Sequence, residues 1–167
     1  ENDGIINAST FGKGNAGNVA IKASQGVTVG GALTSGVFDT GEGNGGSITI
    51  DTSTLTLEND GIINASTTGK GNAGDINIKA RNITIDQGGV DSFALGDGEG
   101  KGGNININTS NLTLENDGII NASTFGKGDA GNIAIKATQG VNVRENALLS
   151  STVSWHFFVV KIRETLC

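Results

Sequence analysis

Proline, methionine and tyrosine are absent from this sequence, and cysteine, histidine and tryptophan occur once each. Aromatic residues make up only 4% of the chain, which excludes a core built on large rings and leaves a thin, aliphatic core. The single cysteine is Cys167, the last residue, and this scarcity suits a protein exported unfolded through an oxidising compartment. The single histidine is His156, which lies outside the repeats described below, so a Ser-His or Cys-His pair has no supported base.

The chain also lacks the charge pattern of a nucleic-acid-binding protein. Its net charge is −6, and the acidic residues are scattered, so no basic face is available for phosphates or for an anionic membrane surface. No apolar run reaches the roughly 20 residues that a membrane-spanning helix needs, and we expect no membrane insertion. No initiator methionine or signal-peptide pattern precedes Glu1, which already lies within a repeat, so we expect a piece of a longer protein.

What the chain has instead is internal repetition. The stretch ENDGIINAST recurs almost unchanged from Glu1, Glu58 and Glu115, so its three copies are equally spaced. Within this long period, glycine-rich units follow one another at intervals of 28 or 29 residues, from Gly12, Gly41, Gly69, Gly98 and Gly126. Each unit has a glycine-rich turn, two apolar-x-apolar pieces separated by a polar break, the letters NDG or a variant, and a third extended piece. Period-two alternation, β-branched residues and Gly/Asn/Asp punctuation predict three short strands per unit.

One unit has too few apolar residues to bury a core, so the units are expected to stack as coils of a solenoid. We therefore predict an all-β parallel β-helix over residues 1–154, with about five coils of 28–29 residues and three short strands in each. Strands of adjacent coils would pair at about 4.8 Å, which forms four inward aliphatic ladders. The ladders are Val19, Ile48, Ile76, Ile105 and Ile133; Ile21, Ile50, Ile78, Ile107 and Ile135; Val27, Leu55, Ile83, Leu112 and Val141; and Val29, Leu57, Ile85, Leu114 and Val143.

The long period spans two glycine-rich units, and this doubling has an electrostatic interpretation. In-register stacking of identical units would place like charges about 5 Å apart, which is destabilising. The charges alternate instead, as Lys13, Glu42, Lys70, Glu99 and Lys127 at the turn, and as Lys22, Asp51, Lys79, Asn108 and Lys136 after the first strand. Stacking also predicts a side-chain hydrogen bond between Asn77 and Asn106. Asn7, Asn64 and Asn121 recur only every second coil, so we expect them to satisfy turns and not to bind a ligand.

These units resemble the repeats of filamentous-haemagglutinin-like exoproteins. The resemblance rests on GNAGNVAIKA from Gly14, VTV from Val27 and NDGIINASTFGKGNAGN from Asn2, and it covers residues 1–154. It implies a right-handed parallel β-helix in a large bacterial surface protein, exported by two-partner (type V) secretion through an outer-membrane transporter. The family's N-terminal secretion domain has Asn-Pro motifs, which this proline-free chain lacks. The resemblance supplies no shared catalytic residue.

Two sequence features are candidate sites. GDGEGKGG, from Gly96, superficially resembles a phosphate or calcium loop, but Lys101 is followed by two glycines and a strand, which predicts a turn. A weak metal site at Asp97 and Glu99 stays open. The carboxylate pairs Glu58 with Asp60 and Glu115 with Asp117 repeat Glu1 with Asp3, whereas a catalytic site is a singular departure from a repeat. We therefore predict no catalytic, cofactor-binding or metal-binding residue and no cofactor.

The tail, residues 155–167, does not match the repeat. It holds the only tryptophan, histidine and cysteine and two of the six phenylalanines. Two interpretations stay open: a C-terminal cap over the aliphatic core, which a solenoid needs, or a foreign sequence from a frame shift or the end of a gene fragment.

The predicted function is that of a structural or adhesive rod segment at the bacterial cell surface, secreted and without enzymatic activity. The alternative is a carbohydrate-active or glycan-binding β-helix, for which the variable segments 30–40 and 88–97, with Phe38 and Phe93, are candidate ligand-binding loops. Host or abiotic surfaces and their glycans are the expected partners. Open parallel edges at both ends of the repeat segment also favour end-to-end self-association.

Overall fold

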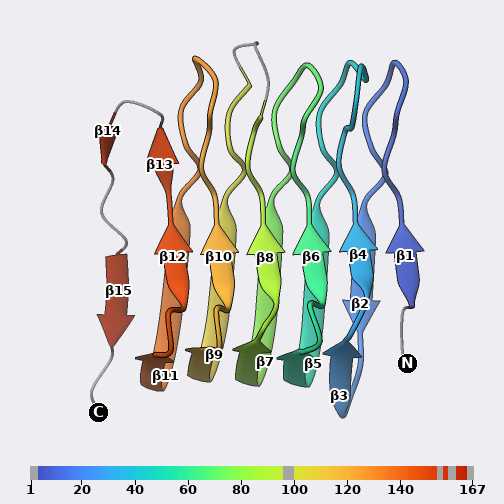
Figure 1. Ribbon diagram of the computed structural model, residues 1–167. Coiled ribbons are helices and arrows are strands. Elements are labelled where there is room, and N and C mark those ends of the chain that lie inside the picture. Colours follow the sequence, from blue (N-terminus) through green and yellow to red (C-terminus); the bar gives the residue numbers. More distant parts are fainter. Residues whose placement is uncertain (1–3, 96–99, 154–155, 158–160, 165–167) are drawn as a thin grey trace.

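The computed structural model describes residues 4–95, 100–153, 156–157 and 161–164. Over these ranges the chain forms strands and turns, with no helix and hence no helix able to cross a membrane. Parallel strands stack through about five turns, which confirms the predicted parallel β-helix (Figure 1). The axis of the rod runs across the strands, from the N-terminal coil to the C-terminal coil.

Two parallel sheets form the sides of the rod. The short-strand sheet contains, in order, β1 (Ile5–Asn7), β4 (Ala32–Thr34), β6 (Ile62–Asn64), β8 (Gly89–Asp91), β10 (Ile119–Asn121) and β12 (Leu148–Ser150). The long-strand sheet contains β2 (Val19–Lys22), β3 (Gly26–Val29), β5 (Ile48–Leu57), β7 (Ile76–Asp86), β9 (Ile105–Glu115), β11 (Ile133–Val143) and β15 (Lys161–Glu164). Single bridges join a third side, at Thr10, Val37, Thr67, Ala94, Thr124 and Val153.

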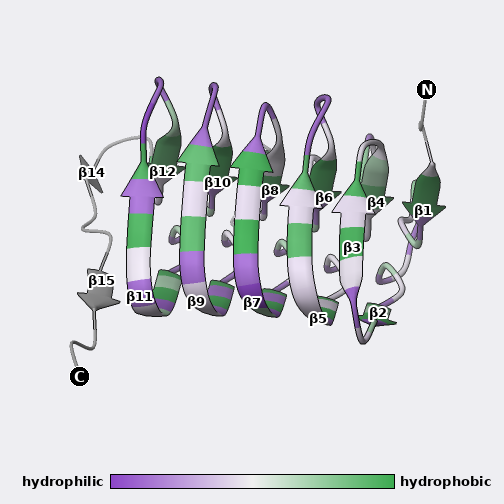
Figure 2. Ribbon diagram, turned by 90° about the horizontal axis from the view of Figure 1, so that it is seen from below, coloured by the Kyte–Doolittle hydropathy of each residue, from purple (hydrophilic) through white to green (hydrophobic). Residues whose placement is uncertain are grey.

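The register of the four predicted ladders is confirmed residue by residue, but Val143, predicted to point inward, is 41% exposed in the last full coil. Ile48 of β5 pairs with Val19 on one side and Ile76 on the other, and the other three ladders continue in the same register through all five coils. Ile48 and Leu55 have no exposed surface. Figure 2 shows the resulting alternation of apolar and polar bands along the long strands. Burial of these aliphatic side chains, at about 25 cal/mol per Å², is the main stabilising term of the rod.

The first two strands predicted in each unit are continuous from β5 onward. The predicted polar break is a bend, at which Thr52 and the equivalent Thr109 are buried. The Thr109 hydroxyl donates a hydrogen bond shared between Arg81 O, at 3.0 Å, and Asn111 O, at 2.8 Å, so its buried hydroxyl is satisfied within the bend. In the first coil the bend separates β2 from β3.

The predicted turn bonds of the asparagines and the predicted bond between Asn77 and Asn106 are confirmed. The side-chain oxygens of Asn7, Asn64 and Asn121 each accept a hydrogen bond from the backbone N–H two residues later, at 2.7–3.0 Å, which closes a local turn. The amide of Asn106 donates to Asn77 across adjacent coils at 3.0 Å.

Charges alternate along the rod as predicted. Glu42 lies between Lys13, at 3.5 Å, and Lys70, at 3.3 Å, and Lys79 lies 3.9 Å from Asp51. We therefore distinguish lysine coils, which are residues 1–29, 58–86 and 115–143, from acidic coils, which are residues 30–57 and 87–114. Glu99, which belongs to the same series, lies outside the described residues.

The two classes of coil also differ at one inner corner. The corner residue is alanine in lysine coils and serine in acidic coils, as in Ala65 and Ser92. The Ser92 hydroxyl donates to Gly74 O of the preceding coil, and the same bond joins Ser35 to Gly17 O. The adjoining turn is Ala-Gly in lysine coils and Gly-Gly in acidic coils, so the packing of the corner alternates together with the charge.

The C-terminal tail contributes two short strands, β14 and β15, to the described residues. β13 (Thr152–Val153) pairs antiparallel with β14 (His156–Phe157), and β15 pairs in parallel with residues 134–137 of β11. Trp155 and residues 158–160 and 165–167, Cys167 included, lie outside the described residues. The tail thus adds one further strand to the long-strand sheet, beyond the last full coil.

Candidate functional site

Each of the variable segments that the sequence singles out contains one short strand of the short-strand sheet. Residues 30–40 contain β4, and residues 88–97 contain β8, and both strands pair in register with their neighbours in the short-strand sheet. Apart from the single bridges at Val37 and Ala94, the other described residues of both segments lie outside paired strands, so the prediction of ligand-binding loops stays a prediction. Asp97 and the metal site proposed there with Glu99 lie outside the described residues.

The phenylalanines of these segments belong to a row of apolar side chains along the third side. The bridges from Thr10 through Thr124 place the residues that follow them one coil apart. That row is Phe11, Phe38, Thr68, Leu95 and Phe125. Its apolar members, together with Phe93, form what we call the apolar strip: Phe11, Phe38, Phe93, Leu95 and Phe125. Phe11 and Phe38 have ring centroids 5.9 Å apart, and Phe93 and Phe125 form an edge-to-face pair at 6.4 Å.

The apolar strip is open to solvent. Phe11 is 58% exposed, Phe125 is 55% exposed and Leu95 is 45% exposed, whereas Phe38 and Phe93 are half-buried. The strip consists of two apolar groups, Phe11 with Phe38 and Phe93 with Leu95 and Phe125, and Thr68 occupies the row in the coil between them. Exposed apolar groups of this kind mark interaction sites. The sequence identified Phe38 and Phe93 but missed the other three residues, whose common row follows only from the bridge register.

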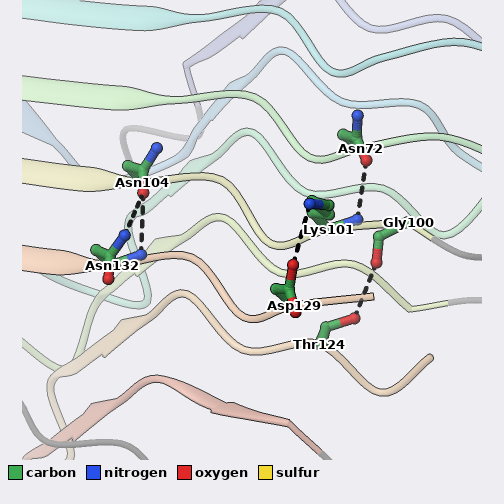
Figure 3. A network of polar contacts seen from close by, with 7 residues as sticks. All are labelled: Asn72, Gly100, Lys101, Asn104, Thr124, Asp129 and Asn132. Atoms are coloured by element: carbon green, nitrogen blue, oxygen red, sulfur yellow. Dashed lines mark hydrogen bonds and ion pairs between the residues drawn. The ribbon is translucent and has the colours of Figure 1, made fainter. Parts of the chain in front are cut away.

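The glycine turn around Lys101 is held by contacts within the β-helix (Figure 3). The Lys101 backbone N–H donates to the Asn72 side chain at 2.9 Å, and its ammonium group lies 3.0 Å from the Asp129 carboxylate. Asn104 accepts two bonds from Asn132 in the same way, at 3.0 and 3.2 Å. Lys101 is therefore an internal partner of the next coil, at a position where the first three coils carry asparagine.

Glu58 and Asp60 are both exposed, whereas Glu115 and Asp117 have different surroundings. Asp60 and Asp117 lie in exposed turns, with φ of 62° and 64°, a conformation that Asn and Asp tolerate. Glu115 instead bonds Arg144, which directly follows the last full coil and whose Nε donates at 2.8 Å, and this hydrogen bond raises the pKa of Arg144. Glu1 and Asp3 lie outside the described residues.

A shallow groove of about 320 Å³ is the polar feature that sequence reasoning missed. It is hollow because Gly89 of β8 stands, without a side chain, between Ile62 and Ile119 of the adjacent coils. Asp91 lines it together with Asp60 and Asp117, and burial raises the pKa of Asp91 from 3.8 to about 6. The clue in the sequence was an aspartate at the position that carries threonine, Thr34, in the other acidic coil.

Within the described ranges, no set of three or more His, Cys, Asp or Glu residues is placed to hold a metal ion. No family model, curated protein or solved structure matches this chain. The two features with a chemical capacity are therefore the apolar strip, which can bind an apolar or ring-bearing surface, and the groove at Asp91, which places one weakly acidic carboxyl group beside exposed carboxylates.

Proposed function

We propose that the chain is a non-enzymatic structural and adhesive rod segment of a secreted bacterial surface exoprotein. The observation that carries this proposal is the exposure of the apolar strip along the rod. A side chain such as Phe11, 58% exposed, gains roughly 25 cal/mol for each Å² that a partner removes from water. Because the strip spans several coils, its residues engage one surface together, and several weak contacts then act as one stronger attachment.

The resemblance of residues 1–154 to filamentous-haemagglutinin-like repeats supports the rest of the proposal. It favours export by two-partner secretion through an outer-membrane transporter and a location at the cell surface. Uniform repetition supports a structural role as well, because a stack of similar coils can be lengthened without changing the contacts within it.

A glycan-binding β-helix is the second candidate, and the aromatic pairs favour it. The rings of Phe11 and Phe38, and of Phe93 and Phe125, come from adjacent coils and meet at 5.9 and 6.4 Å. Such paired rings present apolar faces that can cover the C–H face of a sugar. The carboxyl group of Asp91 lies elsewhere, on the short-strand sheet, and so does not act together with these rings.

A surface-binding assay tests both candidates. We expect the purified chain to be retained on alkyl-coated beads and on polysaccharide-coated beads, and a triple variant with Phe11→Ser, Leu95→Ser and Phe125→Ser to lose most of this retention. Leu148→Ser is the matched control, because Leu148 is 51% exposed but lies in β12, on the short-strand sheet. Equal retention of the triple variant and the unmodified chain would refute the role of the strip.

The two kinds of bead separate the candidates. Retention on polysaccharide that soluble polysaccharide reverses, with little retention on alkyl beads, favours glycan binding. Retention on alkyl beads that soluble polysaccharide leaves unchanged favours general adhesion.

A further inference from the structure

The N-terminal end of the β-helix exposes the same core surface that is covered inside the rod. A groove of about 810 Å³ opens there, lined by Ile6, Ile21 and Val27 among others. Ile6 is 52% exposed, whereas its counterpart Ile63, one full period later, is completely buried. The difference has a direct cause: the surface of the coil at residues 58–86 is covered by the acidic coil at residues 30–57.

The interior of the rod therefore shows which kind of coil covers such a surface. At each of the two internal steps from an acidic coil to a lysine coil, the acidic coil supplies the covering strands, β4 with β5 and β8 with β9. We propose that the N-terminal end is an interaction surface for one further coil and that it selects a coil of the acidic class.

Charge is the first basis of this selection. At the internal step Glu42 lies 3.3 Å from Lys70. Lys13, the counterpart of Lys70 in the first coil, has a side chain 86% exposed, and its bond to Glu42 lies on the side away from the open end. An acidic coil would place a carboxylate opposite Lys13, whereas a lysine coil would place a second ammonium group about 5 Å away.

Steric fit is the second, independent basis. In the acidic coil, a Cβ added at Gly45 would lie 2.6 Å from Gly74 N and 2.7 Å from Ala65 O of the next coil. At the other such step, a Cβ at Gly102 would lie 2.7 Å from Gly131 N. Lysine coils carry alanine at this position, so a lysine coil stacked on a lysine coil meets a clash that glycine avoids.

The first coil presents the same corner to whatever covers it. Gly17 N donates to Ala8 O at 2.8 Å, as Gly74 N donates to Ala65 O at 2.8 Å one period later. The open end therefore reproduces the alanine corner against which Gly45 packs inside the rod, whereas the corner of an acidic coil carries serine, as in Ser35 and Ser92. Charge and packing thus select the same class of coil.

A second copy of the chain is a poorer occupant by both criteria. Its last full coil, residues 115–143, is a lysine coil, with Lys127 at the turn and Ala130 at the crowded position. The edge of β11 at residues 134–137 is, in addition, already paired with β15. We therefore expect the unmodified chain to sediment as a monomer at low salt, and end-to-end oligomers would overturn the proposal.

Two extended proteins of equal added length test the selection. In the first, a copy of residues 30–57, an acidic coil, precedes Glu1 and so reproduces the natural junction between Leu57 and Glu58. In the second, a copy of residues 58–85, a lysine coil, precedes Glu1. The readouts are the urea midpoint, the m-value, which rises with the surface buried on folding, and amide hydrogen exchange of β2 and β3.

We expect the acidic extension to raise the midpoint and the m-value and to slow exchange in β2 and β3 by about tenfold or more. The lysine extension should leave all three readouts near those of the unmodified protein. Equal stabilisation by both extensions, or none by either, would overturn the proposal.

A third variant tests whether the lysine extension fails to stack because of its charge and its alanine or for an unrelated reason. Lys70→Glu and Ala73→Gly, made together within the added lysine coil, restore the acidic charge and the glycine at the crowded position. We expect this variant to recover most of the protection given by the acidic coil. A lysine coil that stays unprotected after both changes would show that charge and fit do not govern the surface, which overturns the proposal.

Discussion

Replacement of Asp91 by asparagine should stabilise the protein at neutral pH. Asp91 ends β8 and lies in register between Asn64 of β6 and Asn121 of β10. Burial raises its pKa from 3.8 to about 6, so the folded protein holds a proton between these pH values that the unfolded chain has released. Stability associated with the protonated group is fully present below about pH 4 and is lost as the pH rises through about 6.

The size of this effect follows from the two pKa values. They differ by about 2, and each pKa unit corresponds to about 1.4 kcal/mol, so the buried carboxylate costs about 2–3 kcal/mol at pH 7. Asparagine has nearly the same shape without the charge, and it extends the column formed by Asn64 and Asn121. We expect Asp91→Asn to raise the free energy of unfolding at pH 7 by about 2–3 kcal/mol, or the Tm by about 4–12 °C.

Urea unfolding followed by far-UV circular dichroism at pH 4, 5, 6 and 7 measures this effect. The difference between Asp91→Asn and the unmodified protein should be near zero at pH 4 and should grow toward pH 7. Asp117→Asn is the matched control, since it removes the same charge from an exposed residue of the same groove and should change stability by less than about 0.5 kcal/mol. A difference independent of pH, or equal stabilisation by the control, would refute the reasoning.

Two further changes probe the corner packing and the charge alternation. Gly103→Ala should destabilise the protein by more than about 3 kcal/mol in urea unfolding, because its Cβ would overlap Gly74 O. Gly140→Ala, at a position with open space around it, should change stability little. Similar urea midpoints for the two variants would contradict this packing argument. Glu42→Lys, which would stack three lysines, should cost about 0.5–1 kcal/mol at low salt and much less in 1 M salt; a cost unchanged by salt would show that repulsion is not its cause.

The aliphatic core could be predicted from the sequence because in-register stacking makes adjacency in space equivalent to a fixed interval along the chain. Every position in the ladder of Ile48 recurs at the interval between successive glycine-rich units, and its partners in the structure are the predicted ones. The same reasoning placed the hydrogen bond between Asn77 and Asn106.

The apolar strip could not be predicted by that interval. On the short-strand side, Ala32 pairs with Ile5 in the coil before it and with Ile62 in the coil after it, and the second of these partners is further away along the chain than the first. The turns that precede these strands differ in length between lysine coils and acidic coils, so equivalent positions drift away from the average period. Phe11 and Phe38 therefore meet although the interval that aligns the core ladders does not align these two residues.

The groove and the inner corner were missed for a different reason. The depth of the groove depends on the missing side chain of Gly89 between two isoleucines, and the raised pKa of Asp91 depends on burial. Both are properties of side-chain volume in three dimensions. The alternation of alanine and serine at the corner was present in the sequence, but its pairing with the Ala-Gly and Gly-Gly turns depends on contacts between residues far apart in the chain, such as Ser92 and Gly74.

The direction of the strands also determines how the rod responds to tension. The strands run across the axis, so the hydrogen bonds between coils lie along it, and a pull on the two ends opens the bonds of one coil before it reaches the next. Each coil that opens replaces about 4.8 Å of rod with about 95 Å of extended chain, at about 3.4 Å per residue. A surface protein built from such coils would lengthen in discrete steps under flow, and so limit the peak force on its attachment while the remaining coils stay folded.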